Sequence, residues 1–159
     1  MAVLDYIIPG YKGYRQRDEA RQSDKLFREH LSKALAAESV RCENAKNDLT
    51  HSGNLAALNP ADQATKILMK VRDRLKFANY GFQSGLFGSK DETQMVQAVE
   101  EYDKGLVDDT EAVRAQVQEI ENVLMEAGNV APEFQKLTRI LREFDDKLNR
   151  REAIIKGTA

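Results

Sequence analysis

The sequence predicts an all-α protein in which four long amphipathic helices form two antiparallel hairpins. Apolar residues recur at three- and four-residue steps through four stretches of the chain, which places them on one face of a helix. The 159 residues include three prolines and nine glycines, so long stretches carry no helix breaker. Short links join the first stretch to the second and the third to the fourth, as antiparallel partners require. We expect a four-helix bundle, with an extended, partly coiled-coil arrangement as the alternative.

Residues 1–14 are predicted to form an aromatic, non-helical lead to a single helical-bundle domain over residues 15–159. The apolar start of the chain ends at Pro9 and Gly10, and Gly13 follows between two tyrosines. Glycine and proline at this spacing disfavour a helix. The apolar start is too short for a signal core or a membrane span, and it lacks a basic leader. We therefore expect a cytoplasmic protein that meets a membrane only through its surface.

The first helix is expected to begin between residues 15 and 18 and to end near His51, where Gly53 supplies a stop signal. Its apolar stripe is Phe27, Leu31, Ala34, Leu35, Cys42, Ala45 and Leu49. Asn59 and Pro60 then offer a helix cap and a proline suited to a first turn. The second helix follows over about residues 60–79, with the stripe Ala64, Ile67, Leu68, Val71, Leu75 and Ala78.

Three glycines between residues 81 and 88 interrupt the helical pattern, and residues 89–92, Ser-Lys-Asp-Glu, form a capping box that predicts the start of the third helix. Its stripe is Val96, Val99, Tyr102, Leu106, Val113, Val117, Ile120 and Leu124. Gly128 is predicted to end this helix in the left-handed conformation. The fourth helix then runs to Gly157, with the stripe Phe134, Leu137, Leu141, Phe144, Leu148 and Ile155.

Charge is distributed unevenly along the chain, although the net charge is only -2. This small net charge gives no general attraction to nucleic acid, so a nucleic-acid partner is not expected. The third helix is acidic, through Glu100, Glu101, Asp103, Asp108, Asp109 and Glu111. We expect a solvated face, balanced by cations of the second helix (Lys70, Arg72, Arg74, Lys76) and of the fourth (Arg139, Arg142). The alternative is an acidic surface that selects a basic partner.

Two segments rich in aromatic residues and glycine make up the candidate interaction surface. Its members are Tyr6, Ile7, Ile8, Tyr11, Lys12, Tyr14, Arg15, Arg17, Tyr80, Phe82 and Phe87. In one interpretation the N-terminal aromatics dock on residues 77–88 and close one end of the bundle. In the other they face outward as an apolar wedge, rimmed by the basic patch Lys12, Arg15, Arg17, Arg21, Lys25 and Arg28, which suits an anionic membrane.

Catalytic, metal and cofactor sites find no support in the sequence. A dinuclear metal bundle needs paired Glu-x-x-His motifs, and none occurs; the nearest fragment is Asp48 to His51. The single cysteine, Cys42, lies in an apolar stripe, which indicates a buried thiol rather than a nucleophile. Residues 81–90 are glycine-rich but end in Gly-Ser-Lys, the wrong order for a phosphate loop, and offer at most a weak anion site at a helix start. We predict no catalytic residue, no metal, no cofactor and no enzymatic activity.

Two blocks of the sequence resemble a family of uncharacterised bacterial all-helical proteins. The first is Gly-Tyr-Lys-Gly-Tyr-Arg-Gln-Arg at residues 10–17, and the second is Arg-Asp-Arg-Leu-Lys-Phe-Ala-Asn-Tyr-Gly at residues 72–81. Together with Gly85 to Phe87 they cover about a quarter of the chain. The resemblance implies an all-helical fold and brings no established activity to particular residues.

Two hypotheses for function follow. The first is a non-enzymatic helical scaffold or adaptor that acts through protein–protein contacts. A second copy of the chain is one candidate partner, because the first and third helices look longer than the second and part of their apolar stripes is expected to lack an internal partner. The second is a peripheral membrane protein that uses the aromatic and basic N-terminus as an interfacial anchor.

Overall fold

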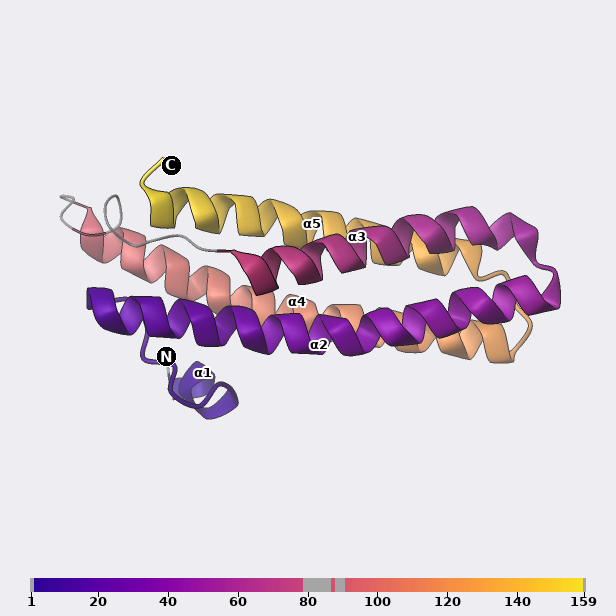
Figure 1. The fold of residues 1–159 in the computed structure, drawn as a ribbon, viewed down its shortest axis with the longest axis horizontal. Coiled ribbons are helices and arrows are strands. Elements are labelled where there is room, and N and C mark those ends of the chain that lie inside the picture. Colours follow the sequence, from indigo (N-terminus) through magenta and orange to yellow (C-terminus); the bar gives the residue numbers. More distant parts are fainter. Residues whose placement is uncertain (1, 79–86, 88–90, 159) are drawn as a thin grey trace.

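The computed structural model describes residues 2–78, 87 and 91–158, and it shows a four-helix bundle with a short helix beside it (Figure 1). The elements are α1 (Ala2–Ile7), α2 (Arg17–Ser52), the 3-10 turn η1 (Leu55–Ala57), α3 (Leu58–Phe77), α4 (Glu92–Met125) and α5 (Ala131–Lys156). α2 packs against α3 and α4, and α5 packs against the same two helices. The predicted all-α fold of two antiparallel hairpins is therefore confirmed.

The prediction of a non-helical lead over residues 1–14 is wrong for its first half, because Ala2–Ile7 forms α1. Leu4 and Ile8 lie four residues apart and are both buried, and the Ile8 amide donates a hydrogen bond to the Leu4 carbonyl. Packing of this one face stabilises a helix that is too short to persist alone. Residues 8–14 are non-helical as predicted, and α2 begins at Arg17, within the expected range of residues 15–18.

The starts of α3 and α4 differ from the predicted caps. α3 begins at Leu58, directly after η1, so Ala57 rather than Asn59 precedes the helix; Pro60 does lie in the first turn. In α4 the residue before the helix is Asp91, whose side chain makes no capping hydrogen bond. The predicted capping residue Ser89 lies outside the described residues.

The apolar stripes of the two long helices are buried within one chain. Buried positions run from Ala20 to Leu49 along α2 and from Val96 to Ile120 along α4. The N-terminal segment and the second half of α5 cover the part of these stripes that lies beyond the end of α3, through Tyr11, Tyr14, Leu148 and Ile155. The surplus apolar stripe that we expected on these helices is therefore absent from the described part of the chain.

Two cations of α3, Lys70 and Arg74, pair with α5 rather than with the acidic helix α4. Arg74 lies 2.8 Å from Asp145 and 2.7 Å from Glu152, and Lys70 lies 3.5 Å from Asp145. The expected arrangement, in which these cations balance the acids of α4, is wrong because α3 and α4 stand at opposite corners of the bundle. Part of the acidic cluster is also not solvated, since Glu100 and Asp103 are buried.

The end of α4 offers the first test of the fold. Ala127, not Gly128, adopts the left-handed conformation, with φ 54°, and a Cβ atom on Gly128 would lie 3.0 Å from Val123 Cγ1. The predicted left-handed role of Gly128 is therefore wrong, and that glycine permits a close approach instead. Ala127→Gly should raise the free energy of unfolding by about 0.5–1 kcal/mol, because glycine adopts positive φ without strain.

Urea denaturation followed by circular dichroism measures this change. The matched control is Ala115→Gly, at an exposed position inside α4, which should lower the free energy of unfolding by about 1 kcal/mol. If Ala127→Gly destabilises the protein as Ala115→Gly does, the left-handed turn at residue 127 is incorrect.

Candidate functional site

Residues 8–16, which we call the strap, connect α1 to α2 and cross from α2 to α4. The Lys12 amide donates to Ser23 Oγ on α2 at 2.9 Å, and the Tyr14 amide donates to Glu100 Oε1 on α4 at 3.2 Å. Gly13, between them, has φ +80°, and a Cβ atom there would lie 2.5 Å from Glu100 Oε1. Only glycine combines this conformation with so close an approach to α4.

Two tyrosines of the strap enter a buried polar network. The hydroxyls of Tyr11 and Tyr14 both donate to Asp103 Oδ2, at 2.9 and 2.5 Å. Arg151 Nε donates to Asp103 Oδ1 at 2.6 Å, and its Nη2 donates to the Tyr14 hydroxyl at 2.6 Å and lies 2.8 Å from Asp24 Oδ1. Arg151 and Asp103 are both 0% exposed. The network therefore joins the strap, α2, α4 and α5 at one end of the bundle.

Two aromatic rings lie beside the guanidinium of Arg151, in addition to its carboxylate partners. Its guanidinium carbon lies 4.5 Å from the centroid of the Phe27 ring and 5.8 Å from that of Tyr14. Asp24 also takes a 2.8 Å hydrogen bond from Arg28 Nε, and Arg28 Nη1 reaches the Leu75 carbonyl near the end of α3 at 3.0 Å. Arg28, expected in an exposed basic patch, is therefore an internal residue that ties α2 to α3.

Burial determines the ionisation of the network. Desolvation raises the pKa of the Tyr11 and Tyr14 phenols well above their usual value, so both remain neutral donors. Desolvation also raises the pKa of Asp103, while the Arg151 charge opposes that shift. Desolvation lowers the pKa of Arg151, but the Asp103 charge and its hydrogen bond outweigh it, so this pKa lies well above the usual value. Asp103 accepts three hydrogen bonds, as an ionised carboxylate does.

The predicted surface residues separate into inward and outward groups. Ile8, Tyr11 and Tyr14 are buried, whereas Ile7, Lys12, Arg15 and Arg17 are exposed and Tyr6 is 90% exposed. Phe87 is half-buried, with the Arg17 guanidinium carbon 5.5 Å from its ring centroid. Tyr80 and Phe82 lie outside the described residues. The strap tyrosines thus dock on α4 and α5, while the last residues of α1 face solvent.

Comparison with known proteins adds nothing to this geometry. No family model, no curated protein and no solved structure matches the chain.

The single cysteine of the chain is buried in the core. Burial raises the pKa of the Cys42 thiol to about 12, so it stays protonated, as expected for a core residue. Among the described residues, no group of three or more His, Cys, Asp or Glu side chains is arranged to hold a metal ion. None of the helices in the described ranges is long and apolar enough to cross a membrane.

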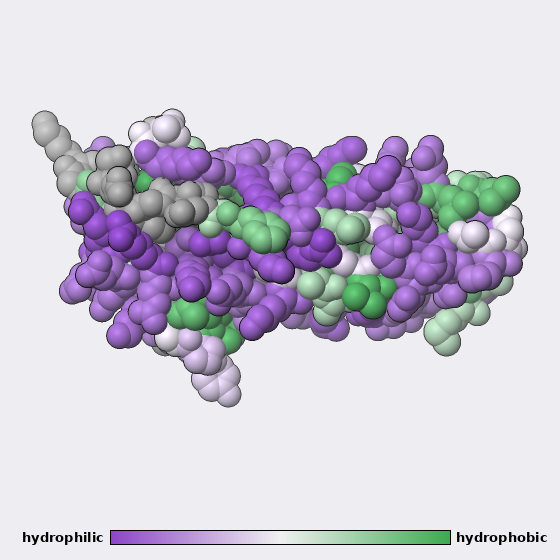
Figure 2. Space-filling view, viewed as in Figure 1, coloured by the Kyte–Doolittle hydropathy of each residue, from purple (hydrophilic) through white to green (hydrophobic). Residues whose placement is uncertain are grey.

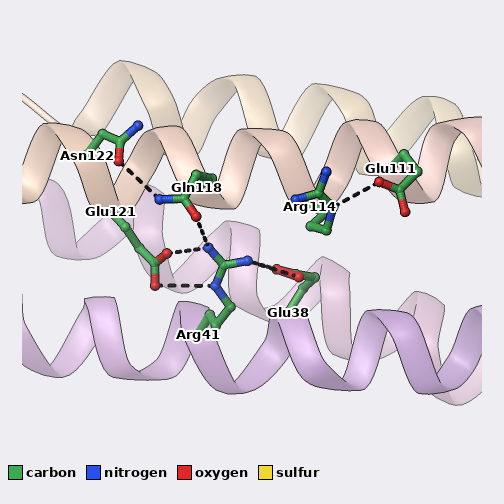
Figure 3. A network of polar contacts seen from close by, with 7 residues as sticks. All are labelled: Glu38, Arg41, Glu111, Arg114, Gln118, Glu121 and Asn122. Atoms are coloured by element: carbon green, nitrogen blue, oxygen red, sulfur yellow. Dashed lines mark hydrogen bonds and ion pairs between the residues drawn. The ribbon is translucent and has the colours of Figure 1, made fainter.

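A second, more exposed polar cluster joins α2 to α4 in the half of the bundle where both helices end (Figure 3). Arg41 pairs with Glu121, lies 3.0 Å from Glu38 and donates to Gln118 at 2.9 Å. Its ion pairs are partially exposed, so water and salt screen them and each contributes little to stability. We regard this cluster as a structural contact between two helices.

An open groove of about 670 Å³ lies between α2 and α3. We call it the Phe77 groove, because Phe77 is 73% exposed at its end. Its lining residues are Glu29, Ser32, Lys33 and Ala36 from α2 and Arg72, Asp73, Lys76 and Phe77 from α3. Figure 2 shows a mostly polar surface on this face, with apolar side chains in small separate patches.

Proposed function

We propose that this protein is a non-enzymatic helical adaptor that binds a protein partner through its N-terminal helix α1. One observation carries the proposal: α1 is held to the bundle on one side and offers apolar side chains on the other. Leu4 and Ile8 are buried, whereas Tyr6 is 90% exposed and Ile7 37% exposed. Figure 1 shows α1 projecting from the side of the bundle next to α2.

The anchoring of the strap explains why this exposed pair suits recognition. The buried network holds Tyr11 and Tyr14 in place, so α1 is connected to the bundle through a segment that is already ordered. A preorganised element loses less conformational entropy on binding than a disordered one. Tyrosine is also enriched among the residues that dominate binding energy in interfaces. Tyr6 on a fixed support therefore has the properties of an interface anchor.

Site-specific photo-crosslinking tests the proposal. A photoreactive residue at position 6 should give a discrete adduct with another protein chain in cells. The matched control is position 55, where Leu55 is 70% exposed in the link between α2 and α3 at the other end of the bundle. Adducts of equal yield from both positions, or none from position 6, would contradict a recognition role for α1.

A second candidate is contact with an anionic membrane, since exposed cations lie close to α1 in the sequence. These are Lys12, Arg15, Arg17, Arg21 and Lys25. The exposed acids Asp5 and Asp18 lie in the same segment and weaken the attraction. Flotation of the full chain with phosphatidylserine vesicles tests this candidate, with Tyr6→Ala as the comparison. Deletion of residues 1–14 is less informative, because it also removes Tyr11 and Tyr14 from the buried network.

A further inference from the structure

The Phe77 groove presents an aromatic ring and cations without a described occupant. Its α2 wall is made by residues at positions 29, 32, 33 and 36, and its α3 wall by residues at 72, 73, 76 and 77. This spacing collects each set on one helix face, so the groove runs along both helices. A groove that runs along two helices can accept a short helix or an extended segment laid between them.

The charge of the groove favours an acidic ligand. Arg72 lies 2.9 Å from Asp73, so these two opposite charges are paired within the wall. The other charged residues that line the groove are the two cations Lys33 and Lys76 and one acid, Glu29, so the lining carries a net positive charge. The Lys76 ammonium lies 5.4 Å from the centroid of the Phe77 ring. A ligand that places an aromatic ring on Phe77 and a carboxylate near Lys33 and Lys76 would match both properties of the groove.

The outward face of α1 has this chemistry. Asp5, Tyr6 and Ile7 are consecutive and all exposed, so an acid, an aromatic ring and an aliphatic chain lie at one projecting end. We infer that α1 of one molecule binds in the Phe77 groove of a second copy of the chain. In this contact Tyr6 covers Phe77, and Asp5 approaches Lys33 and Lys76. The inference rests on the proposed function and names its partner.

The occupant is a second copy because α1 is already placed elsewhere in its own chain. Leu4 and Ile8 pack in the core, the strap binds α2 and α4, and no described residue of α1 lines the groove. Within the described residues, the same chain therefore carries a groove with no side chain seated in it and an exposed projection of matching chemistry. The two surfaces differ, so contacts form either reciprocally in a closed dimer or successively in an open chain.

Association measured by sedimentation velocity over a range of concentrations tests this inference. The wild-type protein should associate, and Tyr6→Ala and Phe77→Ala should each weaken association at least about tenfold, the effect of losing an interface anchor. Both side chains are largely exposed, so both variants should keep the wild-type helical content and melting temperature. Leu55→Ala, at an equally exposed apolar position outside both surfaces, should associate as the wild type does.

Mixing the two variants gives the sharpest result. The Tyr6→Ala protein retains an intact groove and the Phe77→Ala protein retains an intact α1. An equimolar mixture should therefore associate at a concentration at which each variant alone is largely monomeric. A wild-type protein that stays monomeric at every concentration overturns the inference, and so does a mixture that does not associate.

The failure of this inference is distinguishable from failure of the proposed function. If the protein is monomeric but position 6 crosslinks to a different protein, α1 is a recognition element and the second copy is not its partner. If position 6 crosslinks to no protein chain, both statements fail. Flotation of wild-type protein on anionic vesicles that Tyr6→Ala abolishes, without self-association, would assign α1 to a lipid surface and overturn the inference.

Discussion

Asp103→Ala is expected to lower the free energy of unfolding by about 3–5 kcal/mol, the usual effect of removing one partner of a buried ion pair. The substitution leaves the Arg151 guanidinium with Asp24 as its remaining carboxylate in the network. It also removes the acceptor of the Tyr11 and Tyr14 hydroxyls, which are buried and cannot turn to water. Urea denaturation followed by circular dichroism measures the loss.

Asp108→Ala is the matched control for this experiment. Asp108 lies on the same helix but is exposed, so its replacement should change the free energy of unfolding by less than about 0.5 kcal/mol. Because domains of this size are stable by about 5–15 kcal/mol, the Asp103 variant should remain folded or nearly so at low temperature. An Asp103→Ala protein as stable as the Asp108→Ala protein would show that the network does not hold the bundle together.

Arg151→Met is expected to destabilise the protein by a similar amount, about 3–5 kcal/mol at neutral pH. It leaves Asp24 and Asp103 buried without the arginine that lies between them. Arg150→Met is the control, since Arg150 is the exposed neighbour on α5 and its loss should have little effect. Both variants replace arginine by methionine, so the difference between their free energies of unfolding reports the burial and the partners of Arg151.

The pH dependence of the Arg151→Met protein provides an independent measurement. Burial raises the pKa of Asp103, and without Arg151 no charge in the network opposes that shift. A group whose pKa is higher in the folded than in the unfolded state stabilises the fold as the pH falls through the folded pKa. The deficit of Arg151→Met relative to wild type should therefore shrink as the pH is lowered from neutral toward the usual pKa of a carboxylic acid. A deficit that stays constant or grows over this range would contradict an ionised, buried Asp103.

The long helices of the bundle were predictable because the signals that mark a helix lie within its own stretch of sequence. Apolar residues at three- and four-residue steps mark α2 to α5, and Gly53 and Gly157 adopt the left-handed conformation that ends α2 and α5. The helix α1 was missed because a six-residue segment has little helical tendency of its own. It forms because Leu4 and Ile8 find partners in the core, and the sequence does not display those partners.

The buried network was visible in the sequence only as an irregularity. Asp103 stands between Val99 and Leu106 at stripe spacing, and Arg151 stands between Leu148 and Ile155 in the same way. Because charged residues are rarely buried, Asp103 was predicted to be exposed together with the other acids of α4. The sequence did contain one signal for an internal ion pair: α4 and α5 each carry one charged residue of opposite sign within an apolar stripe.

The contacts of the strap could not be predicted from the sequence. Tyr14 and Arg151 are 137 residues apart, and their hydrogen bond exists only because α4 and α5 bring Asp103 and Arg151 to the same end of the bundle as the strap. From the sequence, the aromatic residues next to cations allowed two interpretations, docking within the bundle or an outward-facing surface. The structure divides that segment instead, with Tyr11 and Tyr14 used for anchoring and Tyr6 left exposed.

Amide hydrogen exchange of the strap in the wild-type protein tests most directly whether this segment is a fixed part of the bundle. The amides of Tyr11, Lys12 and Tyr14 donate to the Ile8 carbonyl, Ser23 Oγ and Glu100 Oε1, respectively. Their exchange, measured by NMR, should be at least about 100-fold slower than in an unstructured peptide. Exchange of all three amides at the rate of an unstructured peptide would show that the strap is not anchored, and the support for presenting α1 would be lost.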